Sequence, residues 1–115
     1  MNHAFDATVR KQSELAIIDL SGEINAFADH ELHAAYTEAE AYDTETIVLN
    51  FTDVIYINST GIALIVSILG RARKSNRKMA VYGLSDHYTE IFQITRLADF
   101  MSIYPDETSL LAQAV

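Results

Sequence analysis

A polar triplet at residues 58–60 separates a strand-like segment from an apolar, helix-length one. The triplet is Asn58-Ser59-Thr60, and Gly61 follows it. A hydroxyl at the start of a helix is suited to phosphorylation, because the free amides and the dipole of the first turn favour an added phosphate. Asn58 and Ser59 are also both good N-cap residues. The triplet therefore allows two roles, a phosphate acceptor and an ordinary helix cap.

A second group of polar residues has the spacing of metal ligands. Asp29, His30 and His33 lie within one helical turn of each other. The zinc-protease pattern needs two residues between its glutamate and its second histidine, and only one separates Glu31 from His33. No third, distant ligand is identifiable. We interpret this group as a solvated helix face and expect no metal.

A third group would be needed for a serine hydrolase. His87 follows Ser85-Asp86, and a hydrolase of this kind would combine Ser59 and His87 with an aspartate. The sequence lacks the Gly-x-Ser-x-Gly elbow of such enzymes and any identifiable oxyanion loop. Ser85 and Asp86 are better explained as the cap of a helix. The residues themselves thus place an enzyme last among the candidate functions.

Length and charge restrict the class of protein. We expect the 115 residues, 1–115, to form one domain. The net charge of −8 repels phosphate backbones, so nucleic acid is not the expected partner. The longest apolar run, Gly61 to Gly70, is half of the roughly 20 residues that a membrane-spanning helix needs. We therefore expect a cytoplasmic protein without membrane insertion.

Strand-like and helix-like segments alternate along the chain. Strands are expected at Phe5–Lys11, Leu15–Leu20, Thr46–Phe51, Lys78–Tyr82 and Met101–Tyr104. Helices are expected at Ala26–Tyr42, Thr60–Lys74, Asp86–Thr95 and Asp106–Ala114. An initial hairpin followed by this alternation predicts an α/β domain with a mixed β-sheet, antiparallel at its start and mainly parallel afterwards.

The predicted helices have different patterns of apolar residues. The helix from Ala26 carries Phe27 on one apolar stripe with Leu32 and Tyr36. The helix from Thr60 is apolar nearly all round, whereas a surface helix shows a polar face. Either this helix is enclosed within the domain, or one side of it is a surface kept for a partner.

Three stretches, in order and in register, resemble one known family. LAIIDLSGEIN is similar to the apolar strand ending in Gly-Glu-Leu-Asp of the STAS domain. IVLNFTDVIYINSTGIALI resembles the strand and the Asp-Ser-Ser-Gly-Leu or Asp-Ser-Thr-Gly-Leu signature of that family. EIFQITRLADFMSIYPDETSLL resembles its C-terminal helix, strand and helix. The resemblance covers essentially the whole chain, as in the free-standing bacterial anti-sigma factor antagonists, or anti-anti-sigma factors.

The resemblance implies a regulatory function in transcription, by partner switching. In such proteins a GHKL-type serine kinase, which is the anti-sigma factor, phosphorylates the serine after the signature aspartate, and a PP2C-type phosphatase restores it. By position the acceptor is Ser59, with Thr60 as the alternative. The resemblance implies a rim of Asn25, Asn58, Thr60, Gly61 and Ile62 that takes part in partner binding. It implies no catalysis and no cofactor in this chain.

Two positions depart from the family pattern. Asn58 replaces the signature aspartate, and Asn25 replaces the aspartate of Gly-Glu-Leu-Asp. Both changes keep a hydrogen-bonding oxygen and remove a negative charge from the rim. They favour an alternative function, in which an unphosphorylated STAS protein is an accessory subunit of a lipid or anion transporter in the membrane.

Overall fold

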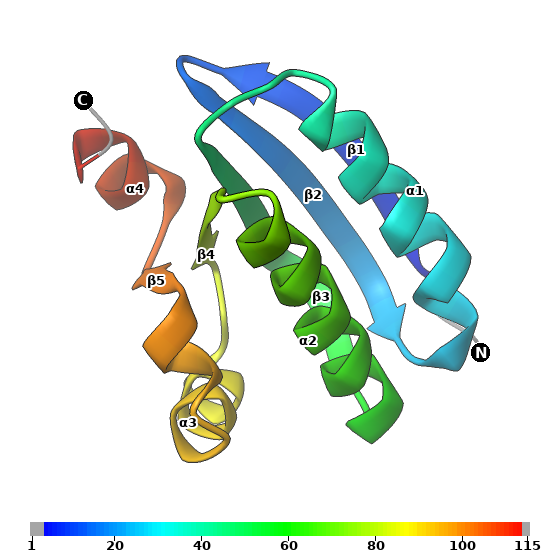
Figure 1. The fold of residues 1–115 in the computed structure, drawn as a ribbon. Helices are drawn as coiled ribbons and strands as arrows, with labels where there is room; N and C mark the ends of the chain where they lie inside the picture. The colour runs from blue at the N-terminus through cyan, green and yellow to red at the C-terminus, as the bar shows by residue number, and fades with distance from the viewer. Residues whose placement is uncertain (1–3, 114–115) are drawn as a thin grey trace.

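Five strands form one mixed sheet in the order β1-β2-β3-β4-β5. The computed structural model describes residues 4–113 (Figure 1). The strands are β1 (Asp6–Gln12), β2 (Leu15–Ile24), β3 (Thr46–Ile57), β4 (Lys78–Tyr82) and β5 (Ser102–Tyr104). β1 is antiparallel to β2, and each later pair is parallel. The predicted mixed sheet with an antiparallel start is confirmed.

Within residues 4–113 the strands are accompanied by four α-helices, the last of which follows the last strand, and by two short 3₁₀ helices. They are α1 (Asp29–Glu40), α2 (Ser59–Lys74), α3 (Asp86–Ile94) and α4 (Glu107–Gln113), with η1 (Ala26–Ala28) and η2 (Leu97–Phe100). α1 and α2 lie side by side across one face of the sheet (Figure 1). Ala114, the predicted end of the last helix, lies outside the described residues. None of the helices within residues 4–113 is long and apolar enough to cross a membrane.

An apolar cluster covers each face of the sheet. Successive side chains of a strand point to opposite faces and so join different clusters. On β3, Ile47 and Leu49 belong to the large core beneath α1, α2 and α3, whereas Val48 points to the other face. There it joins a smaller apolar cluster with Leu110 of α4. All three β3 residues are fully buried, as expected for a strand covered on both faces.

The second and third strands are longer than predicted. Their predicted ends at Leu20 and Phe51 are wrong, because β2 continues to Ile24 and β3 to Ile57. The register between them shifts twice along this extension, where β3 carries the extra residues of β-bulges. β4 pairs with β3 only as far as residue 50, and β1 pairs with β2 only as far as Ser21, so beyond these residues β2 and β3 pair with each other alone. The residues that follow both strands therefore lie beyond the main body of the sheet.

The first helix begins later than predicted. α1 starts at Asp29, because residues 26–28 form the separate 3₁₀ helix η1. The side-chain oxygen of Asn25 caps η1 by accepting a 2.9 Å hydrogen bond from the amide of Phe27. The predicted place of Phe27 on the apolar stripe is wrong, since 93% of this residue is exposed.

A polar network connects α4 to the sheet. Arg10 donates to Asp19, with its Nε 2.7 Å from Oδ2, and also donates to Glu107. The hydroxyl of Tyr82 donates to Glu107 at 2.7 Å, and Asn50 donates to Asp19 at 2.8 Å. Burial opposes ionisation of Asp19, but the hydrogen bonds from Arg10 and Asn50 outweigh it and lower its pKa. Hydrogen bonds from Arg10 and Tyr82 lower the pKa of Glu107.

We expect Arg10→Gln to lower the free energy of unfolding by about 1 kcal/mol at neutral pH, because this ion pair is partly exposed. Asp19 and Glu107 have lowered pKa values in the folded state, so their contribution is complete above the ordinary values of 3.8 and 4.5. The contribution is lost as the pH falls through the lower folded values. The two proteins should therefore converge in acid, measured by urea unfolding followed by circular dichroism.

Lys78→Gln is the matched control. The ion pair of Lys78 with Glu45 is largely exposed on both sides and should contribute little. A loss on Arg10→Gln that is equal at every pH, or no larger than the loss on Lys78→Gln, would show that the network does not hold α4.

Candidate functional site

Asn25 and Asn58, which were predicted to lie at the rim of the site, follow the ends of two parallel strands at one edge of the sheet. Ile24 at the end of β2 is in register with Ile57 at the end of β3. Asn25 and Asn58 are the next residues along the chain, and each caps the helix that follows it. Ligand sites of α/β proteins lie where carboxyl ends of parallel strands meet, so this edge is the first place to seek a functional site.

Asn58 is the N-cap of α2. Its Oδ1 accepts a 2.8 Å hydrogen bond from the amide of Gly61, and its carbonyl accepts one of 2.9 Å from the amide of Ile62. Ser59 and Thr60 are both exposed, and neither hydroxyl forms a hydrogen bond with any other residue of the described range. The cap and the candidate acceptor are thus separate residues. Of the two candidate N-cap residues, Asn58 and Ser59, Asn58 is the cap.

Gly61 lets α2 approach the end of β2 closely. A Cβ atom at this position would lie 2.1 Å from the carbonyl oxygen of Ile24 and 2.9 Å from Cγ2 of Ile57. The same Ile24 oxygen accepts a 3.2 Å hydrogen bond from the amide of Asn58. The position of the first turn of α2 is therefore fixed by contact with the strand backbone.

Tyr88 of α3 holds the end of β3. Its hydroxyl accepts a 2.8 Å hydrogen bond from the amide of Ile57 and lies 3.4 Å from the carbonyl oxygen of Ile57. Ser85 caps α3, as predicted, by accepting from the amide of Tyr88. Tyr88 did not appear among the candidate residues, because no local pattern shows that its hydroxyl reaches a strand 31 positions earlier.

Large apolar side chains are exposed on the elements that flank the start of α2. Phe27 of η1 is 93% exposed, and η1 lies against α2. Ile55 and Tyr56 at the end of β3 are each more than half exposed. Exposed apolar side chains beside a site are candidates for a protein interaction surface. We call these three residues, Phe27, Ile55 and Tyr56, the apolar rim.

Only one side of α2 is covered. Leu64, Ile65 and Ile68 are buried in the main core, whereas Val66 is 48% exposed and Ile62 is partly exposed. Of the two explanations for its apolar sequence, enclosure within the domain is therefore wrong. The outward side is an apolar surface on a helix that also carries the candidate acceptor.

The polar group around His33 connects α1 and α2. Nε2 of His33 lies 3.2 Å from Oγ of Ser67, and Nδ1 lies 3.2 Å from Arg71. Asp29 is 3.7 Å from Nε2. Residues 4–113 contain no group of three or more histidine, cysteine or acidic side chains placed to hold a metal ion. The ring of His87, from the imagined hydrolase, packs edge-on against that of Tyr88.

A profile of the STAS domain matches residues 6–110. The chain belongs to the STAS domain family. The family resemblance of the three sequence stretches is thereby confirmed. Among its relatives, the anti-sigma-B factor antagonist of Staphylococcus aureus is 28% identical over 92 residues, which cover 80% of this chain and 85% of that protein.

Solved structures of other proteins share the fold. An anti-sigma factor antagonist from Mycobacterium paratuberculosis superposes with a TM-score of 0.81 at 17% identity, over 96% of this chain and 93% of that one. The phosphorylated form of SpoIIAA, the Bacillus cell fate determinant, superposes with a TM-score of 0.71 at 20% identity, over 97% and 100% of the two chains. At these identities the likeness concerns the fold.

We expect Asn58→Ala to lower the free energy of unfolding by about 1 kcal/mol, because the amide of Gly61 loses its acceptor. Asn58→Asp should retain stability, since a carboxylate caps a helix equally well and is favoured by the helix dipole. Ser59→Ala is the control and should change stability by less than about 0.5 kcal/mol. Urea unfolding measures all three, and an equal loss for Ser59→Ala and Asn58→Ala would contradict the assignment of the cap.

The two glycines of α2 provide a further pair of variants. Gly61→Ala should cost about 3 kcal/mol or more, because the new methyl group would overlap the Ile24 carbonyl. Gly70→Ala should raise stability by about 0.5–1 kcal/mol, because a Cβ there meets no atom within 4 Å and alanine favours the helix. Thermal unfolding distinguishes them, and similar effects of both changes would disprove the close approach at Gly61.

Proposed function

We propose that this chain is an anti-sigma factor antagonist that acts by partner switching, with Ser59 as the phosphorylated residue. The observation that carries the proposal is the separation of roles at the start of α2. Asn58 supplies the cap, and the Ser59 hydroxyl is exposed and has no partner within residues 4–113. A kinase could modify Ser59 without removing an interaction that holds the helix.

The start of α2 suits a phosphate for electrostatic reasons. The first amides of a helix lack intrahelical acceptors, and the helix dipole favours negative charge there. A phosphate adds about −1.5 to −2 charges at neutral pH. With the apolar rim nearby, such a charge would have to lose its hydration when a partner covers the surface. Phosphorylation of Ser59 would therefore weaken partner binding while leaving the fold intact.

The proposed partners follow from the relatives. The S. aureus protein is named an anti-sigma-B factor antagonist, so the partner of this chain is proposed to be an anti-sigma factor, a GHKL-type serine kinase. A PP2C-type phosphatase would reverse the modification. The binding surface would include Asn25, Asn58, Thr60, Gly61 and Ile62 together with the apolar rim. In this proposal residues 1–115 act as a single cytoplasmic domain that supplies a surface and no catalysis.

Asparagine in place of aspartate at positions 25 and 58 should affect the modification more than the fold. Both side-chain oxygens accept capping hydrogen bonds, from the amides of Phe27 and Gly61 respectively. Neutral amides at these positions repel a phosphate on Ser59 less than carboxylates would. The cognate kinase is therefore proposed to position Ser59 without help from acidic side chains at these two caps.

Intact-mass measurement with site mapping tests the proposal. The protein would be isolated from its native host with phosphatases inhibited. A phosphate on Ser59, or on the adjacent Thr60, supports partner switching. Absence of phosphate across growth and stress conditions would contradict it, and copurification with a transporter ATPase or permease would then establish the accessory-subunit function.

We expect Ser59→Asp to weaken binding to the cognate kinase by about tenfold or more, because the added charge must be desolvated at the interface. Ser59→Ala should bind constitutively. Thr108→Asp is the control, since it adds the same charge to an exposed hydroxyl position in the first turn of α4. Isothermal titration calorimetry compares the three, and equal affinities of Ser59→Asp and Ser59→Ala would refute the switch.

A further inference from the structure

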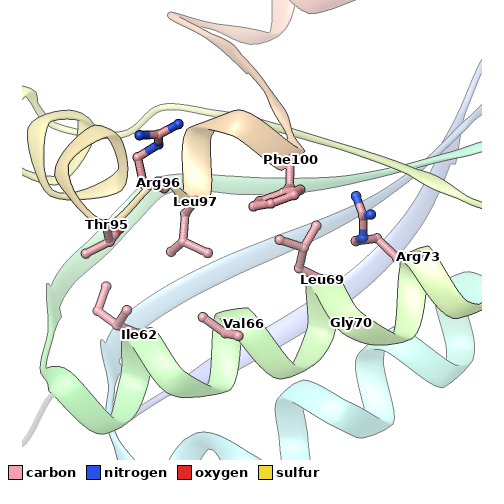
Figure 2. Close-up of a pocket in the computed structure, with 9 residues that line it drawn as sticks. All are labelled: Ile62, Val66, Leu69, Gly70, Arg73, Thr95, Arg96, Leu97 and Phe100. Carbon is pink, nitrogen blue, oxygen red and sulfur yellow. The ribbon is translucent and has the colours of Figure 1, made fainter.

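An apolar groove of about 390 Å³ lies between α2 and the segment from the end of α3 through η2 (Figure 2). Ile62 and Val66 of α2 line one side, and Leu97 and Phe100 of η2 line the other. Its volume is within the roughly 300–1,000 Å³ typical of small-molecule sites. From Ile62 to Arg73 the groove follows about 16 Å of helix, at 1.5 Å per residue.

Gly70 leaves space in the groove that the fold does not require. This glycine lies within α2 and lines the groove, and a Cβ atom there would meet nothing within 4 Å. Glycine inside a helix costs stability relative to alanine. No packing contact of residues 4–113 explains that cost. A ligand that approaches the helix backbone would explain it.

An arginine lies at each end of the groove, and only one of the two has an ion pair within residues 4–113. Arg96, at one end, is paired with Asp99 at 2.6 Å. Arg73, at the other, lies over the ring of Phe100, 4.8 Å from its centroid, and has no ion pair with any residue in the range 4–113. In Figure 2, Arg73 and Phe100 lie together at one end of the row of apolar side chains. One end of the groove therefore offers an uncompensated cation beside an apolar channel.

We propose that this groove binds a free single-chain apolar carboxylate of the fatty-acid class. The carboxylate would pair with Arg73, and the chain would pass beneath Phe100 and over Gly70 towards Val66 and Ile62. An elongated apolar groove with one unpaired guanidinium matches a ligand with one chain and one anionic end. The net charge of −8 disfavours anions in general, so binding depends on this guanidinium.

Binding of decanoate, kept below its micelle concentration, tests the proposal on the full chain. Amide shifts in ¹H–¹⁵N spectra report where and how tightly it binds. We expect saturable shifts along the groove and affinity for decanoate about tenfold above that for decanol, because a charge-assisted hydrogen bond selects the anion. Arg73→Gln should abolish this preference, and Lys74→Gln, which changes the next residue outside the groove lining, should keep it.

Gly70→Leu provides an independent test. Its side chain enters open space and should fill the groove, so both decanoate and decanol should lose binding while the circular dichroism spectrum is unchanged. Absence of saturable shifts, equal affinity for the two ligands, or unchanged binding to Gly70→Leu would each overturn the proposal. Binding only to vesicles of anionic phospholipid, and not to monomeric decanoate, would overturn it as well.

Discussion

The contact between the first turn of α2 and the carbonyl of Ile24 determines where every feature of the site lies. This oxygen accepts a hydrogen bond from the amide of Asn58, and Gly61 packs against it without a side chain. Tyr88 fixes the neighbouring Ile57 from the other side. A helix held this closely at its start has little freedom to tilt, so the direction of α2 and the exposure of Ser59 follow from one backbone contact.

The two faces of the sheet carry different elements and different side-chain clusters. One face carries the main core and α2, whose outward side remains uncovered and lines the groove beneath Phe100. The other face carries the smaller cluster with Leu110, and the hydrogen bonds of Arg10 to Asp19 and Glu107 hold α4 against it. The second face thus combines apolar packing with a partly exposed ion-pair network, whereas the face with the candidate site carries the larger apolar core.

Local patterns in the sequence predicted the elements, including both ends of β4, but missed the ends of β2 and β3. The continuous apolar run at 46–51 identified β3, and the apolar run of helix length after residue 60 identified α2. The extension of β2 and β3 was missed because Ser21, Thr52 and Asp53 are polar and Gly22 normally breaks a strand. Only pairing between the two strands keeps these residues in the sheet. The exposure of Phe27 was missed because η1 turns this residue outward. The role of Tyr88 was missed because its hydrogen-bond partner is distant in the chain.

The capping of α2 by Asn58 affects how fast a change at Ser59 could take effect. If the helix depended on the hydroxyl of Ser59, each modification would first have to melt a turn, and each reversal would have to reform it. With the cap on the preceding residue, both chemical states of Ser59 would share one backbone. Under the proposed function, the kinase and the phosphatase alone would then set the rate of the response. No slow refolding of the helix would follow a change in the state of Ser59.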